Sequence, residues 1–327
     1  MKKLLIQFLF IVLFFFSFNS IFGIAIDGKT FLQYSYNLSE NTEDYNSFDV
    51  TRLYLNFKVS LSENIKVRAT TDILRQSEAI NLIVKYIYIR YEKLFSIINL
   101  KAGLIDTPWI GYEEKIWEFR VVSPVFLDLE KRLNSADLGI EINTKLPENY
   151  GEIVISTING EGYKKPEINK FKDIQTRITI VPLAFLEKNL KISGFYTYGI
   201  ESGTDTDNYK ERKREILMLS YQNDFISLAG EYWRSVDQNS PGAIKLITTG
   251  IGTILLLKID KLTFLNRIDE LDTDKDDPIP GYTRIISGIG YKLNEKIVIT
   301  LDNQVKTLQN KTSPIENVVS LHSEINF

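Results

Sequence analysis

The charged side chains best placed for chemistry in this sequence recur at every second position of extended segments. In residues 48–61, Arg52 and Lys58 alternate with apolar residues, and Lys66 and Arg68 repeat the pattern in the next segment. Because successive side chains of a β-strand point to opposite faces, each segment has one apolar and one charged face. Rows of fixed charge select ions when they line a pore.

Patterns for catalysis or metal binding are weak by comparison. The chain has no Cys and a single His, His322, which lies five residues from the C-terminus. This excludes disulfide scaffolds, Cys/His zinc sites and a Cys nucleophile, and no Ser lies in an elbow-type Gly pattern. We therefore predict no enzymatic activity, no metal site, no cofactor and no nucleic-acid partner.

The alternation of apolar and polar residues runs through almost the whole chain after residue 25. Sixteen segments show it or are apolar enough to be strands: 30–38, 48–61, 64–73, 81–92, 97–104, 135–146, 150–159, 173–182, 189–199, 213–222, 225–235, 246–257, 261–270, 281–292, 296–306 and 316–327. Most have the length of about 9–11 residues that a tilted strand needs to cross a bilayer. We find no convincing helical period. The predicted fold class is all-β, a transmembrane up-and-down antiparallel β-barrel of about 16 strands.

The connections between these segments alternate between short and long. Residues 62–63 and 147–149 are short turns, whereas residues 39–47 and 160–172 are long and polar. Outer-membrane barrels have short periplasmic turns and long external loops. A soluble β-protein, the alternative that would bury the apolar faces in a core, has no need of loops sorted in this way.

The two ends of the chain carry targeting signals. Residues 1–25 begin with Lys2 and Lys3, continue as an apolar run and end in small residues, which is typical of a secretory signal peptide. An uncleaved membrane anchor is the alternative. Cleavage would remove two positive charges and change the formal charge from −3 to −5. The chain ends on Phe327, an aromatic last residue that resembles the assembly signal of bacterial outer-membrane barrels.

These signals predict two regions, a signal peptide over residues 1–25 and a barrel over residues 26–327. The predicted location is the bacterial outer membrane, after secretion through the inner membrane. There the barrel would contact outer-membrane lipid and lipopolysaccharide.

The segment FDVTRLYLNFKVSLSENIKVRATTD, residues 48–72, resembles the N-terminal hairpin of the phosphate-selective porin O and P family. The motif NGEGY, residues 159–163, and the terminal Phe327 fit members of that family too. The resemblance implies a sixteen-stranded barrel, usually a homotrimer, that passes small hydrophilic solutes by passive diffusion. Some members are anion-selective through rows of Arg and Lys in the lumen.

Six basic residues fall on the lumen face of the second to fifth predicted strands, where Asp72 is the only acidic residue. They are Arg52, Lys58, Lys66, Arg68, Arg90 and Lys101. One wall of the pore would then be positive, which predicts a mild preference for anions, phosphate among them. The alternative is that the lumen charges only keep the interior wet.

The longest connection, residues 105–134, opens with the irregular stretch TPWIGYEEKIWEFR. Non-helical backbone at membrane depth is tolerated inside a watery lumen, so we predict that this loop folds inward as a constriction loop anchored by its aromatic residues. The alternative is an external cap. Its candidate site residues are Asp106, Trp109, Glu113, Glu114, Lys115, Trp117, Glu118, Arg120, Lys131 and Arg132.

The function predicted from these features is a water-filled porin channel. A non-channel barrel that acts as an adhesin, a structural protein or a binding protein is the alternative from another class. A transporter for sugars or apolar molecules, with Trp109 and Trp117 as a stacking track, is a further alternative.

Overall fold

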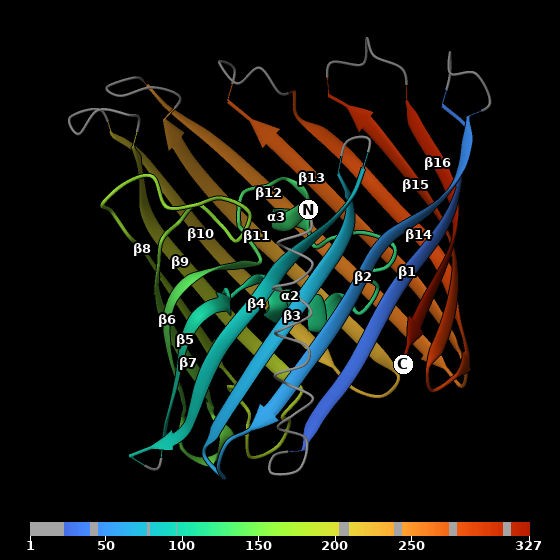
Figure 1. Cartoon of the computed structure of the whole chain (residues 1–327). Helices are drawn as coiled ribbons and strands as arrows, with labels where there is room; N and C mark the ends of the chain where they lie inside the picture. The colour runs from blue at the N-terminus through green and yellow to red at the C-terminus, as the bar shows by residue number, and fades with distance from the viewer. Residues whose placement is uncertain are drawn as a thin grey trace.

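The protein is a closed barrel of antiparallel strands in which β1 pairs with the last strand, β16 (Figure 1). The computed structural model describes residues 23–39, 45–76, 79–95, 97–202, 209–238, 244–274, 280–309 and 315–327. The strands are β1 (Ile24–Asn37), β2 (Asn46–Ser60), β3 (Ile65–Gln76), β4 (Ala79–Leu94), β5 (Ile98–Asp106), β6 (Ala136–Lys145), β7 (Gly151–Ile158), β8 (Asp173–Ile180), β9 (Leu190–Ser202), β10 (Tyr209–Gln222), β11 (Ile226–Gln238), β12 (Lys245–Ile259), β13 (Leu262–Thr273), β14 (Tyr282–Asn294), β15 (Ile297–Leu308) and β16 (Glu316–Asn326). Each of the sixteen predicted segments overlaps one of these strands, and the predicted fold class is confirmed.

Every second side chain of each strand points outward, and most of these outward side chains are apolar, so the outer surface of the barrel is apolar. On β4, for example, Ile87 is 55% exposed and Ile89 is 47% exposed, whereas Lys85 points inward and is only 5% exposed. This arrangement suits a hydrocarbon surrounding, and the closed ladder leaves no strand edge unpaired. Among the described residues, no helix is both long and apolar enough to cross a membrane.

Among the described connections, the short turns at residues 61–64 and 223–225 lie at the opposite end of the barrel from the long connection of residues 159–172 (Figure 1). Two connections break the predicted alternation. Only residues 77–78 separate β3 from β4 at the long-loop end, and residues 181–189 form a longer connection at the short-turn end. The backbone ladder closes beside the chain end, where Gly28 and Phe327 exchange N–H···O hydrogen bonds of 2.8 and 3.0 Å.

The predicted signal peptide lies outside the described residues except for residues 23–25. Strand β1 begins at Ile24, so the first two strand residues precede the predicted boundary at residue 26. They continue the ladder, with Ile24 opposite Val59 and Ala25 opposite Lys58.

Contrary to the sequence interpretation, the barrel region contains short helices. They are α2 (Ile110–Trp117) and α3 (Phe126–Leu129), both in the longest connection, and the 3₁₀ turn η1 (Pro147–Asn149). On α2 the buried residues are Ile110, Glu113, Ile116 and Trp117, a spacing that puts them on one helical face. The helix is two turns long and one of its buried positions is a carboxylate, so its period was hard to recognise in the sequence.

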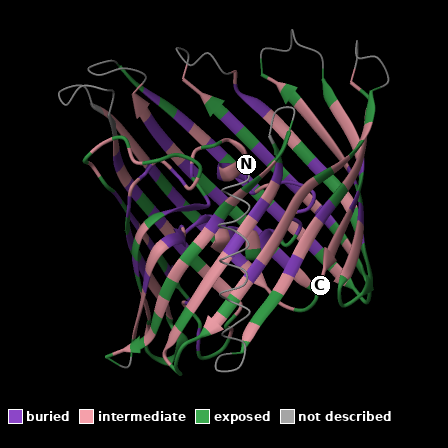
Figure 2. Ribbon diagram, viewed as in Figure 1, coloured by how far each residue is buried: buried purple, intermediate pink, exposed green. Residues whose placement is uncertain are grey.

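The largest apolar cluster lies inside the barrel, between the longest connection and the inner faces of β9–β14. From the wall it includes Phe195, Ile216, Met218, Ala229, Trp233, Ile254, Leu256, Leu265, Leu271, Tyr282 and Ile286. Figure 2 shows these buried positions on the strands behind the connection. The inner face on this side of the barrel is therefore largely apolar.

Candidate functional site

The longest connection runs from residue 107 to residue 135 and lies within the barrel (Figure 1). Its two ends are joined at the wall, because Thr107 N–H donates to the Ser135 carbonyl at 3.2 Å and Thr107 Oγ1 donates to the Asn134 carbonyl at 2.6 Å. The chain between them is therefore a closed loop, which we call the inner loop, residues 107–135.

Aromatic side chains attach the inner loop to the apolar wall. Trp109 is fully buried with its ring 5.7 Å from that of Phe195 on β9. Phe126 is fully buried in edge contact with Trp233 on β11, at 5.1 Å between ring centroids. Fully buried aromatic side chains of this size dominate packing energies, at about 3–5 kcal/mol each on truncation to Ala.

Arginines of the wall also hold the backbone of the inner loop. Arg177 on β8 donates from Nε to the Pro108 carbonyl at 2.8 Å. Arg267 on β13 donates from Nη1 to the Pro124 carbonyl at 2.5 Å and is bidentate to Asp269 at 2.7 Å on both oxygens. These charge-assisted bonds fix the backbone of the loop to the wall.

The opposite face of α2 borders a cavity. Gly111, Glu114, Lys115 and Glu118 line this cavity of about 660 Å³ between the inner loop and a wall formed mainly by β1–β6, with further residues from β7, β8 and β16. The C-terminus of α2 is fixed to the other wall, since Glu118 Oε1 accepts from Lys258 Nζ on β12 at 2.6 Å and from Ser227 Oγ on β11 at 3.0 Å. The helix therefore separates an apolar contact from a polar cavity.

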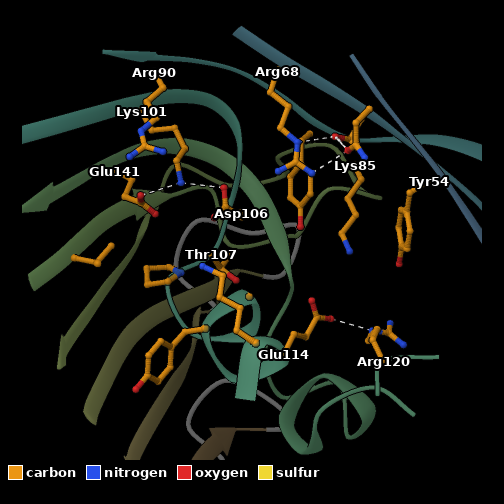
Figure 3. A pocket seen from close by; sticks show the side chains of 18 of the residues that line it. Tyr54, Arg68, Lys85, Arg90, Lys101, Asp106, Thr107, Glu114, Arg120 and Glu141 are labelled. Atoms are coloured by element: carbon orange, nitrogen blue, oxygen red, sulfur yellow. Dashed lines mark hydrogen bonds and ion pairs between the residues drawn. The ribbon is translucent and has the colours of Figure 1, made fainter. Parts of the chain in front are cut away.

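The cavity is lined mainly by charged and hydroxyl-bearing side chains, which Figure 3 shows in close-up. On the wall side, Lys101 Nζ lies 2.9 Å from both Asp106 and Glu141. On the loop side, Arg120 Nε lies 2.9 Å from Glu114. The two sides face each other across the cavity, so a solute that crosses it would meet alternating charges.

Most of the predicted basic residues of the pore wall are paired with carboxylates. Ion pairs of 2.6 Å join Arg52 to Asp72 and Lys58 to Asp27, and one of 2.7 Å joins Lys66 to Glu92. Arg90 also approaches Glu92, at 3.5 Å. Asp27 and Glu92 lie outside the predicted strand segments or at their ends, so the sequence interpretation left them out of the charge count. The wall is less positive than predicted.

Half of these six residues line the cavity. Arg68, Arg90 and Lys101 do so, whereas Arg52, Lys58 and Lys66 are not among its lining residues. The cavity lining also includes Lys85 on β4, a basic residue that the sequence interpretation missed. A break in the alternation of β4, where apolar outward positions change from even to odd numbers after residue 84, was the signal that could have revealed it.

The candidate residues of the inner loop divide into three groups. Glu114, Lys115, Glu118 and Arg120 line the cavity, together with Asp106, which is the last residue of β5 and not part of the loop. Trp109, Trp117 and Glu113 face the wall and are buried. Lys131 and Arg132 are absent from the cavity lining, and Arg132 contacts Asp237 and Thr248 on the apolar side of the barrel.

Two of these placements correct the sequence interpretation. Glu113 was expected among the charges at the narrow point, but it is 1% exposed and accepts a hydrogen bond from Trp109 Nε1 at 2.9 Å. A stacking track of Trp109 and Trp117 is not formed, because both rings are fully buried and neither lines the cavity.

Glu113 lies on the inner loop, outside the membrane-spanning strands. Its burial raises the pKa of its carboxyl to about 7, although Arg267 and the Trp109 hydrogen bond act in the opposite direction. The carboxyl of Glu231 on β11 lies beside it. Two adjacent buried carboxyls repel each other when both are ionised, which favours a proton on one of them. The attachment of the inner loop therefore depends on the protonation of this pair of carboxyls.

No protein-family model matches the chain, and no curated protein sequence matches it. Solved structures do match, at low sequence identity. The anion-selective porin from Comamonas acidovorans superposes with a TM-score of 0.71 and 11% identity over 94% of this chain and all of that chain (100%). The outer-membrane channel DcaP of Acinetobacter baumannii gives 0.69 and 11% over 93% and 97%. OprB from Pseudomonas putida gives 0.62 and 9% over 93% and 94%.

The fold is the porin barrel. At these identities the likeness shows the fold and no more. Within this barrel the inner loop packs on the side of β9–β14 and leaves the charged cavity on the side of β1–β8. Such an arrangement can hold water and mobile ions against fixed charges, which is the physical basis of selectivity in pores.

Proposed function

We propose that the protein is an outer-membrane porin that forms a water-filled channel for passive diffusion of small hydrophilic solutes. The observation that carries the proposal is the charged cavity of about 660 Å³ between the inner loop and the wall of β1–β6. Its lining is polar, whereas the outer surface of the barrel is apolar, as expected for a barrel with water inside and lipid outside. The inner loop is the constriction loop of this channel.

The channel has a mild preference for anions. Nine basic residues and six acidic residues line the cavity, and fixed charge near a constriction repels ions of its own sign. Phosphate is one candidate anion. The porin from Comamonas acidovorans, one of the similar structures, is anion-selective, so a barrel of this fold can prefer anions.

The remaining parts of the proposal concern assembly. Residues 1–25 are a signal peptide that is cleaved during export, and Phe327 is the recognition signal for insertion into the outer membrane. The inserted barrel contacts lipid and lipopolysaccharide through its apolar exterior and forms a homotrimer. A structure of an outer-membrane protein from Vibrio cholerae with the same fold is described as a trimer form.

Reconstitution into planar lipid bilayers tests the proposal. Purified protein should produce stepwise increases in conductance, and the reversal potential under a KCl gradient should indicate a modest excess of chloride permeability. A barrel that serves as an adhesin or structural protein would insert without conductance steps. A channel that prefers potassium would contradict the anion preference but not the channel itself.

A further inference from the structure

Lys85 owes its position to a β-bulge. Across the β3–β4 ladder Thr70 faces Tyr86 and Thr71 faces Val84, so Lys85 has no residue opposite it. The outward positions shift at this point from Val84 to Ile87. An inserted residue of this kind re-aims the side chains next to it, and here it leaves both Lys85 and Tyr86 on the cavity side of β4.

Two cations share the ring of Tyr86. Lys85 Nζ lies 5.4 Å from its centroid, and the guanidinium carbon of Arg68 lies 4.9 Å from the same centroid. Lys85 Nζ is also 5.0 Å from the ring of Tyr54 on β2. Aromatic faces attract cations but carry no net charge. The rings therefore hold the two positive groups in place without neutralising them.

Neither cation forms an ion pair with an Asp or Glu of the described part of the chain. Arg68 donates hydrogen bonds to Asn56 and Thr70. Asp27 and Asp106 also act on Arg68, but they are paired with Lys58 and Lys101. The acidic residue that faces Lys85 from the inner loop is Glu114, and it is already paired with Arg120 at 2.9 Å (Figure 3). Because Lys85 is only 5% exposed, water screens this excess positive charge poorly.

We propose that Lys85 and Arg68 form a discrete binding position for one small anion on its way through the cavity. This inference rests on the proposed channel and names the residues that set its ion preference. The faces of Tyr54 and Tyr86 are already occupied by cations, so the position recognises charge and does not stack aromatic solutes. Small inorganic oxyanions and small carboxylates share the required chemistry.

The test compares two variants with the same change in charge. Lys85→Met removes the buried ammonium and keeps the length of the side chain. Lys145→Met removes an exposed ammonium that lines the same cavity at the end of β6. We expect the ratio of chloride to potassium permeability to fall about fivefold in Lys85→Met, the factor for one unit charge at about 4 Å in water. Lys145→Met should change the ratio by much less, because bulk salt screens an exposed charge.

A second measurement uses the unaltered protein and does not depend on the folding of a variant. A binding position predicts that conductance saturates as the KCl concentration rises, and that added acetate or inorganic phosphate reduces the chloride current. Block by acetate, by phosphate or by both supports the position and identifies its preferred anion. A conductance that rises linearly with KCl and responds to neither anion would overturn it, as would equal effects of the two variants. Absence of any channel in the unaltered protein would instead contradict the proposed function.

Discussion

The two inner walls of the barrel are built from the same kind of strand but carry opposite chemistry. On the side of β1–β6 most of the residues that border the cavity are charged or polar. On the side of β9–β14 many are apolar, among them Trp233, Ile254 and Leu256, and the inner loop covers them. Inward positions of this barrel are therefore apolar where the inner loop packs on them, and polar where they border the cavity or, like Arg267 and Asp269, pair with each other.

This division also explains why the inner loop adopts one position. A mobile loop inside a uniformly polar lumen would have no reason to prefer one wall, since exposed polar contacts contribute little. Here burial of Trp109, Trp117 and Phe126 against apolar strands supplies the preference. The loop then presents Glu114 and Arg120 to the other wall, so one attachment defines both the apolar contact and the charged cavity.

Removal of the inner loop should change the difference between the two walls most. Deletion of residues 109–130 would expose the apolar wall to water and join its space to the cavity. We expect a severalfold rise in single-channel conductance and a loss of ion selectivity, because the narrow part of the lumen disappears. Bilayer recordings of the refolded variant would measure both. Unchanged conductance would mean that the loop does not restrict the lumen.

Truncation of a single anchor should weaken the contact without removing it. Trp109→Ala deletes a fully buried ring that packs on Phe195, and we expect a loss of about 3–5 kcal/mol. Urea unfolding in detergent micelles, followed by the heat-dependent shift in electrophoretic mobility, would measure the loss. Trp109→Phe keeps most of the packing and should lose clearly less; equal losses in the two variants would contradict the packing role.

The attachment of the loop should weaken as the pH rises. Burial raises the pKa of Glu113 from 4.5 to about 7, so the folded protein binds more protons than the unfolded chain between these values. By linkage, stability is greatest below about pH 4.5 and falls towards pH 7, by about 3 kcal/mol at most. Glu113→Gln keeps the shape of the side chain and cannot ionise. The variant should lose this part of the pH dependence in urea unfolding, and an unaltered pH profile would refute the role of Glu113.

A smaller effect is expected where the apolar wall has no room for a methyl group. A Cβ at Gly250 on β12 would lie 2.2 Å from the ring of Trp233, whereas a Cβ at Gly230 on β11 would meet nothing within 4 Å. Gly250→Ala should therefore cost about 1–3 kcal/mol through overpacking. Gly230→Ala is the matched control on the outer surface. Comparable unfolding curves for both variants would show that the ring of Trp233 is not fixed by the loop.

The barrel itself was predictable from the sequence because its determinants are local. Alternation with a period of two is set by strand geometry, and sixteen segments could be recognised from neighbouring residues alone. The outward position of Leu321 and the inward position of His322 on β16 follow the same rule and are confirmed. Strand ends and the two exceptional connections depended on weaker local signals.

The site was harder to predict because its determinants are distant in sequence. Whether Arg52 or Lys58 carries free charge depends on Asp72 and Asp27, which lie on neighbouring strands. Lys85 was missed because a bulge shifts the alternation by one residue. The apolar inner faces were visible in the sequence of residues 245–259, where inward Ile254 and Leu256 break the polar pattern, but their partner is the inner loop, which lies more than a hundred residues earlier.

Thiol modification of two adjacent residues on α2 tests the central claim most directly. The chain has no Cys, so each variant contains a single thiol. Lys115 lines the cavity, whereas Ile116 is 2% exposed and packs on the apolar wall. A charged methanethiosulfonate reagent added to open channels should reduce the current of Lys115→Cys in steps and leave Ile116→Cys unchanged. Equal responses at the two positions, or no response in Lys115→Cys, would contradict a loop that faces the lumen with one side and the wall with the other.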